Sequence, residues 1–146
     1  MPKKKLLFLL LLVSLLLTLS VSVVAAQSSL PVVTIKATDP TAKEPTDNGQ
    51  FTVYRTNSTS TAPLTVYYSV SGTATNGQDY VSLSGSVTIP GGMTSAPIPV
   101  TVRDDTLRES PETVIVRLIP YCPGPLPCTY NIGTSGTATV TIYDND

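Results

Sequence analysis

The sequence predicts an all-β protein, a sandwich of two antiparallel sheets that together hold seven strands. No segment after residue 30 shows the periodicity of an amphipathic helix. Short runs rich in β-branched and aromatic residues recur there instead, and glycine, proline, asparagine or aspartate bounds each run. Several runs alternate apolar and polar residues, as a strand with one buried face does. The number and spacing of these runs predict a single domain.

The first four strands are defined by their composition and by the turns beside them. The first is expected at 32–36, where valine and isoleucine dominate. The second, 50–55, follows the turn Asp47-Asn48-Gly49. The third, 64–70, is rich in valine and tyrosine, and the fourth, 85–89, ends at the breaker Pro90-Gly91-Gly92.

The last three strands are expected at 96–102, 113–118 and 137–143. Alternation is clearest in the first and last of these, whose inward sides are predicted to carry apolar residues: Ile98, Val100 and Val102, then Ala138, Val140 and Ile142. The start of 96–102 is expected at a sheet edge, because its two prolines lack the N–H that a central strand would donate.

Residues 1–26 have the parts of a secretory signal peptide, so 27–146 is expected to be the mature domain. Three lysines precede a long apolar run, which ends in Val24-Ala25-Ala26 before polar residues. The apolar run is also long enough for a membrane span, so an uncleaved N-terminal anchor is the alternative. Export to the outside of the cell or to its surface is expected in either case.

The mature part is mildly acidic and contains two cysteines. The leading lysines account for three of the nine cationic residues, so 27–146 carries six against ten acidic ones, a net charge of −4. There is no basic patch, which argues against a nucleic-acid partner. In an exported chain, Cys122 and Cys128 are expected to form a disulfide that closes a proline-rich loop.

All ten acidic residues of the mature part are expected at one end of the sandwich. If seven strands alternate in direction, the first, third, fifth and seventh strands end at the same pole. The acids fall in the links that follow those strands: Asp39, Glu44 and Asp47, then Asp79, then Asp104, Asp105, Glu109 and Glu112, and finally Asp144 and Asp146. The opposite links contain no acidic residue.

Such a collection of carboxylates repels itself unless a cation lies among them. Ca²⁺ accepts six to eight oxygen ligands in adaptable geometry, which loops converging from separate strands can supply. Softer metals are disfavoured because the chain has no histidine. The alternative is that these acids are solvated loop residues, since aspartate favours turns.

The sequence resembles the Calx-beta domain, the module of sodium–calcium exchangers, integrin β4 and many bacterial surface proteins. Five motifs in order carry the resemblance: EPTDNGQFTVYR at 44–55, GTATNGQDY at 72–80, GSVTIPGG at 85–92, DDTLRESPET at 104–113 and ATVTIYDND at 138–146. The resemblance implies an immunoglobulin-like sandwich. It also implies a set of calcium ligands: Glu44, Asp79, Asp104, Asp105, Glu109, Asp144 and Asp146.

Two details of the motifs temper this expectation. Asn145 stands in the middle of the terminal acidic triplet, and the region around Glu44 is longer than in compact members, so fewer or weaker ions are expected. Glu112 matches a glutamate that the resemblance assigns to structure rather than to calcium.

The sequence therefore predicts a non-enzymatic, extracellular module that binds Ca²⁺ and serves adhesion, matrix or cell-surface interactions. A metal-free structural or protein-binding sandwich is the alternative. Catalysis is disfavoured because a nucleophilic triad needs a base such as histidine, and the absence of tryptophan leaves little for a sugar platform. Other surface or matrix proteins are possible partners, and the membrane is one only if the leading segment is retained.

Overall fold

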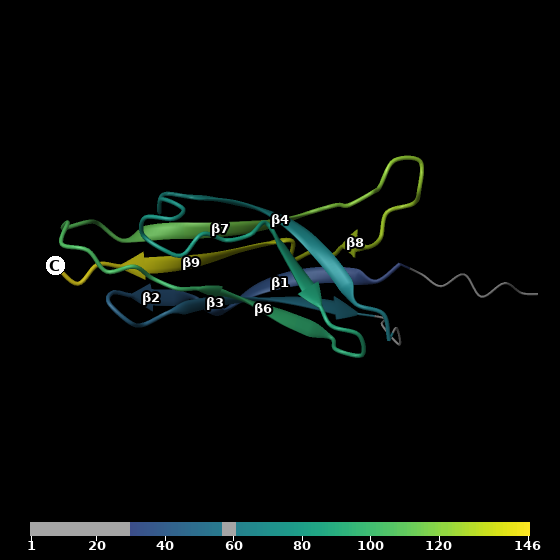
Figure 1. Cartoon of the computed structure of the whole chain (residues 1–146), viewed down its shortest axis with the longest axis horizontal. Helices are drawn as coiled ribbons and strands as arrows, with labels where there is room; N and C mark the ends of the chain where they lie inside the picture. Colours follow the sequence, from purple (N-terminus) through teal and green to yellow (C-terminus); the bar gives the residue numbers. More distant parts are fainter. Residues whose placement is uncertain (1–29, 57–60) are drawn as a thin grey trace, which may run out of the picture.

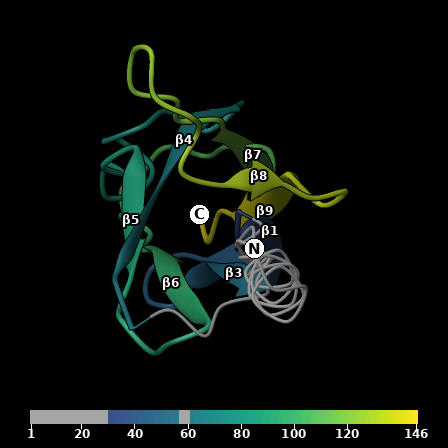
Figure 2. The same ribbon diagram turned by 90° about the vertical axis from the view of Figure 1, so that its right-hand side faces the viewer.

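The computed structural model describes residues 30–56 and 61–146, and these residues form two stacked β-sheets (Figure 1). No helix long and apolar enough to cross a membrane occurs among them. The expected signal segment, 1–26, lies outside the described residues. The all-β sandwich that the sequence predicts is confirmed, and Figure 2 shows β4 and β7 in one layer and β3 and β6 in the other.

Nine strands make up the two sheets. In chain order they are β1 (Val32–Asp39), β2 (Thr41–Lys43), β3 (Gly49–Thr56), β4 (Leu64–Gly72), β5 (Ser86–Ile89), β6 (Ser95–Val100), β7 (Glu112–Ile119), β8 (Asn131–Ile132) and β9 (Thr137–Tyr143). One sheet has the order β6-β3-β1-β8, and the other has the order β2-β9-β7-β4-β5. All seven expected strands form, and β2 and β8 are additional.

The two additional strands introduce parallel pairing into a sandwich that was expected to be antiparallel. β2 pairs with β9 in parallel, and β8 pairs with β1 in parallel. β2 pairs in parallel because the chain changes sheet after β1. It passes Pro40, which has no N–H to donate, and then joins the opposite sheet beside β9. Strands of two or three residues are too short to show alternation, so the sequence pattern did not indicate them.

The core lies between the sheets, and valine is its commonest residue. Its fully buried side chains include Phe51, Ile35, Val53, Val66, Val114, Val116 and Val140. Ile98 and Val100 of β6 point into this core, as the alternation predicts. β6 is an edge strand, so Pro97 and Pro99 remove no hydrogen bond from the interior of the sheet.

The links between strands gather at two poles. The acidic pole consists of four segments, called its four links below: 44–48, 73–85, 101–111 and the terminal residues 144–146. Figure 1 shows it at the end marked C. The disulfide pole, at the other end, consists of links 61–63, 90–94 and 120–130. The division of links between two poles therefore follows the expected alternation of strand direction.

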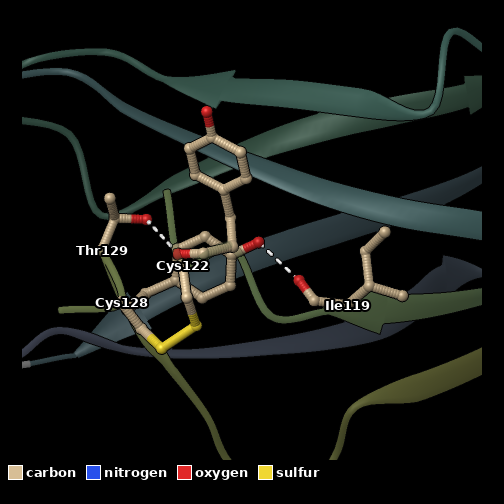
Figure 3. Close-up of a disulfide and its surroundings, with 6 residues drawn as sticks. Ile119, Cys122, Cys128 and Thr129 are labelled. Atoms are coloured by element: carbon tan, nitrogen blue, oxygen red, sulfur yellow. Dashed lines mark hydrogen bonds between the residues drawn. A yellow bond between two sulfur atoms is a disulfide. The ribbon is translucent and has the colours of Figure 1, made fainter. Parts of the chain in front are cut away.

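A disulfide and a buried tyrosine organise the second pole (Figure 3). Cys122 and Cys128 are bonded, as expected, and the Thr129 N–H donates to the Tyr121 carbonyl at 3.0 Å. The Tyr130 hydroxyl donates to the Ile119 carbonyl at 2.6 Å and accepts the Tyr67 N–H at 3.0 Å. Tyr130 is 1% exposed, and its hydroxyl ties the link after β7 to Tyr67 in β4 and to Ile119 at the end of β7.

Candidate metal centre

Four links bring the predicted ligands together at the acidic pole. β2, β9 and β7 are neighbours in one sheet, so the residues that follow β2 and β9 and precede β7 lie side by side. Glu44 follows β2, Asp144 follows β9, and Asp104, Asp105 and Glu109 lie in the link that leads into β7. The fourth link, between β4 and β5, contributes Asp79.

Glu44 is the most buried of these residues. The residue is 7% exposed, although it lies in a link rather than in a strand. Its N–H donates to the Tyr143 carbonyl at 3.0 Å, which fixes its backbone beside the end of β9. Burial raises the pKa of Glu44, and the charges of Asp105, Asp144, Asp104 and Glu109 raise it further. Glu44 therefore lies within electrostatic range of four other acidic side chains.

Asp79, Glu109 and Glu112 form the tightest group of oxygen ligands. One carboxylate oxygen from each lies within 4.8 Å of the other two. The pKa of Glu112 is raised to about 7, first by burial and then by a hydrogen bond shared with the Asp79 carboxyl and by nearby negative charges. Its oxygen belongs to the closest group of carboxylates in the part of the chain that the structure describes. The structure therefore adds Glu112 to the candidate ligands.

Glu112 is the first residue of β7, and the Thr113 beside it anchors the link that carries Asp79. The Thr73 N–H donates to the Thr113 hydroxyl at 3.2 Å, and the Thr113 N–H donates to the Thr73 hydroxyl at 2.8 Å. Within its own link, Asp79 accepts the Thr75 N–H at 2.5 Å. These bonds hold Asp79 against the start of β7.

Hydrogen bonds between the last two acidic segments order the outer part of the pole. Asp144 accepts the Asp146 N–H at 3.0 Å and the Glu109 N–H at 2.9 Å, and these bonds lower the pKa of Asp144. The Asn145 side chain donates to the Asp104 carboxylate at 2.8 Å. An amide at position 145 can donate where a third carboxylate would repel.

Not every acid at this pole joins the group. Asp146 is tied to Asp144 through its backbone N–H, and no contact of its own carboxylate with the other predicted ligands occurs in the described residues. Asp39 is the last residue of β1. Asp47 closes a short turn, in which its N–H donates to the Lys43 carbonyl and its carbonyl accepts the Lys43 N–H. Neither of these two contributes to the raised pKa values at the centre.

The residues present fit a hard divalent cation. The group supplies carboxylate oxygens only, and within residues 30–56 and 61–146 no lysine or arginine forms an ion pair with it. No side-chain or backbone donor of these residues forms a hydrogen bond with the Glu44 carboxylate. Oxygen ligands from several loops are the donors that Ca²⁺ takes, and imidazole or thiolate ligands for softer metals are lacking here.

Without calcium, the stability of the domain is expected to fall as pH rises from about 5 to about 8. Glu112 has a pKa of about 7 in the folded domain against an ordinary 4.5, and the pKa values of Glu44 and Glu109 are also raised. The folded state thus binds protons more tightly, and this contribution is full below 4.5 and lost as pH passes 7. Urea unfolding in EDTA at both pH values measures the change.

The Glu112→Gln variant is the control for this pH dependence, because glutamine cannot titrate. Its stability is expected to vary less between the two pH values than that of the unchanged domain. Stability that rises over this interval in EDTA would contradict the assignment of protonated carboxyls at the acidic pole.

Comparisons with known proteins agree with the fold. The crystal structure of the apo-form Calx CBD1 domain superimposes with a TM-score of 0.63 at 24% identity, covering 81% of this chain and 100% of that one. The crystal structure of CBD12 from CALX1.2 superimposes with a TM-score of 0.60 at 24% identity, and the match covers 79% of this chain and 44% of that one. The crystal structure described as the calcium binding domain CBD12 of CALX1.1 superimposes with a TM-score of 0.56 at 23% identity. The match covers 77% of this chain and 44% of that one.

These likenesses establish the fold, and the chain spans 44% of the length of either CBD12 chain. A comparison with curated proteins gives no match. The sequence pattern of the Calx-beta domain matches residues 20–146, which covers both sheets and all four links of the acidic pole. The chain therefore belongs to the Calx-beta domain family.

Proposed function

We propose that the domain is a non-enzymatic module that binds Ca²⁺ at the acidic pole. The observation that carries the proposal is the group of Asp79, Glu109 and Glu112, whose carboxylate oxygens lie within 4.8 Å of one another without a cationic partner in the described residues. Carboxylates this close repel one another unless a cation lies among them. A divalent cation would remove the repulsion that raises the pKa values of Glu44 and Glu112.

The proposed ligands divide into an inner and an outer group. Asp79, Glu109 and Glu112 offer the closest set of oxygens, and Glu44 faces the side where Asp104, Asp105 and Asp144 lie. Asp146 is proposed to act on the orientation of Asp144 through its N–H bond rather than to lead the coordination. These ligands are enough for at least one ion. Asn145 is proposed to be an uncharged residue that connects two links through its hydrogen bond to Asp104.

Calcium is expected to stabilise the domain in proportion to its occupancy. Extracellular modules bind Ca²⁺ with dissociation constants of about 10⁻⁴ to 10⁻³ M. At about 10 mM Ca²⁺ the free energy of unfolding should then rise by about 1–3 kcal/mol relative to EDTA. Thermal or urea unfolding measures this difference, and Mg²⁺ at the same concentration should give less because it demands stricter geometry.

Glu44→Gln is expected to weaken calcium binding by about tenfold or more, because it removes one of the charges gathered at the acidic pole without changing the size of the side chain. Isothermal titration of the unchanged and variant domains measures the loss. Asp47→Asn is the matched control: it neutralises an acid in the same link, outside the group, and should leave the affinity nearly unchanged.

The competing interpretation is a metal-free sandwich with solvated acidic loops. It predicts equal unfolding midpoints in EDTA and in millimolar Ca²⁺. It also predicts that Glu44→Gln, by removing repulsion, stabilises the domain equally in both conditions. Either result would overturn the calcium proposal.

We further propose that the module works outside the cell or at its surface, in adhesion or matrix interactions with other proteins. The Cys122–Cys128 disulfide supports an oxidising compartment, since such bonds are rare in the cytosol. The leading segment, proposed as a signal peptide or an anchor, supports the same location. Fractionation of a tagged full chain, probed for the tag and for N-terminal processing, tests this.

A further inference from the structure

We propose that the domain is built to bear tension along its chain, with the β2–β9 ladder as the clamp that resists it. The proposal rests on strand direction and hydrogen bonding, and it does not depend on calcium. It assigns a mechanical function to β2, the three-residue strand Thr41–Lys43 that changes sheet after β1.

The chain crosses the whole length of the sandwich between its first and last strands. β1 begins at the disulfide pole and runs to the acidic pole, where β2 continues in the same direction. β9 runs parallel to β2 and also ends at the acidic pole, near the end marked C in Figure 1. A pull on both ends therefore draws β1 and β2 towards the disulfide pole and draws β9 towards the acidic pole.

Parallel strands that are drawn in opposite directions along their length are loaded in shear. The Thr141 N–H donates to the Pro40 carbonyl at 2.9 Å, and the Glu44 N–H donates to the Tyr143 carbonyl at 3.0 Å. Every second residue of a parallel strand bonds to its partner, so Ala42 between these two directs its N–H and carbonyl at β9. These bonds must stretch together, so the clamp fails only when several break at once.

Buried side chains reinforce the same ladder. Ala42 is 0% exposed and its register partner Ile142 is 4% exposed, so sliding of β2 along β9 would also pull both out of the core. β1 is held in the same manner, by its long antiparallel pairing with β3 and its short parallel pairing with β8. Tension on the first strands thus meets resistance in both sheets.

β9 pairs in the opposite direction with β7, its other neighbour in the sheet. β7 and β9 are antiparallel, and Glu112 at the start of β7 lies opposite Ile142 near the end of β9. A pull between the link before β7 and the chain end would separate the two strands from one end. Their hydrogen bonds would then break one after another, which needs less force than shear.

Single-molecule pulling in two directions tests the proposal on one folded chain. A handle on a Leu30→Cys variant and a handle at the C-terminus load the clamp in shear, whereas Leu107→Cys and the C-terminus unzip β9 from β7. Leu107 is 64% exposed, and both native cysteines are already bonded, so the introduced thiol is the reactive one. Both experiments use the full chain in EDTA, so their outcome is independent of calcium binding.

The lifetime of the folded state at equal force is expected to be at least about tenfold longer in the shear direction, because two or more hydrogen bonds must fail together. Equal lifetimes, or a shorter lifetime in shear, would overturn the proposal.

A pair of proline variants locates the resistance in β2. Ala42→Pro removes the N–H directed at β9, whereas Thr41→Pro removes one that points away from it. Under end-to-end load, Ala42→Pro should shorten the lifetime and Thr41→Pro should leave it nearly unchanged. Equal effects of the two would exclude β2 as the clamp. If Ala42→Pro does not fold, the comparison of pulling directions decides alone.

Discussion

Replacing Gly72 with alanine is expected to lower the free energy of unfolding by about 3 kcal/mol or more. Gly72 ends β4 with a φ of 125°, a conformation that residues with a side chain rarely adopt. A Cβ added there would lie 2.0 Å from the Thr113 carbonyl oxygen, which belongs to the backbone of β7 and cannot rotate away. The two strands would have to separate.

This separation would also reach the candidate metal centre. Thr113 follows Glu112, and it bonds the link that carries Asp79. Gly72→Ala should therefore weaken calcium binding as well as stability, and urea unfolding with calcium titration measures both.

Gly92→Ala provides the matched control for Gly72→Ala. Gly92 also has a positive φ, of 76°, but a Cβ added there would meet no atom within 4 Å, and the residue belongs to the disulfide pole. The variant should cost only about 1 kcal/mol, the backbone penalty, and should leave calcium affinity unchanged. A similar loss for both variants would show that the close contact with Thr113 does not matter.

Replacing Tyr130 with phenylalanine is expected to cost about 2 kcal/mol. The change removes a hydroxyl that both donates to the Ile119 carbonyl and accepts the Tyr67 N–H, while the buried ring stays in place. Two backbone groups then lose their partner, and leaving a polar group without one costs more than a hydrogen bond contributes. Urea unfolding of the variant measures the loss.

Tyr121→Phe is the control for Tyr130→Phe. Tyr121 is 41% exposed and its ring lies 4.5 Å from that of Tyr67, a contact that phenylalanine preserves. Removal of its hydroxyl should change stability by less than about 0.5 kcal/mol. A neutral Tyr130→Phe variant would mean that water replaces the hydroxyl without loss.

The sequence predicted the long strands because their alternation and bounding turns reflect burial on one face. β6 is a clear example: its inward apolar residues and its edge position both followed from the pattern Ala96-Pro97-Ile98-Pro99-Val100. β2 and β8 could not be predicted in this way, since their position depends on partners far along the chain. Tyr130 was missed for a similar reason, because its partners come from other segments.

The convergence of the acids could be predicted from strand direction alone, and the structure brings Glu44, Asp79 and Glu109 into one region. The role of individual acids could not. Asp146 is bonded to Asp144 through its backbone N–H, and Glu112 shares the closest group of carboxylate oxygens, so the set of calcium ligands stays a prediction. The signal for Glu112 lay in its place as the first residue of β7, where a rigid strand holds the side chain.

The edges of the two sheets have a consequence for how copies of this domain behave when they are crowded. β6 presents Pro97 and Pro99 at its edge, and at β5 the Ser84 hydroxyl already donates to the Ser86 carbonyl at 2.8 Å. The other two edge strands, β2 and β8, have three and two residues. Aggregation between β-proteins begins with free backbone groups along a long, flat edge. Packed closely on a surface, these domains would offer one another little from which to start a shared sheet.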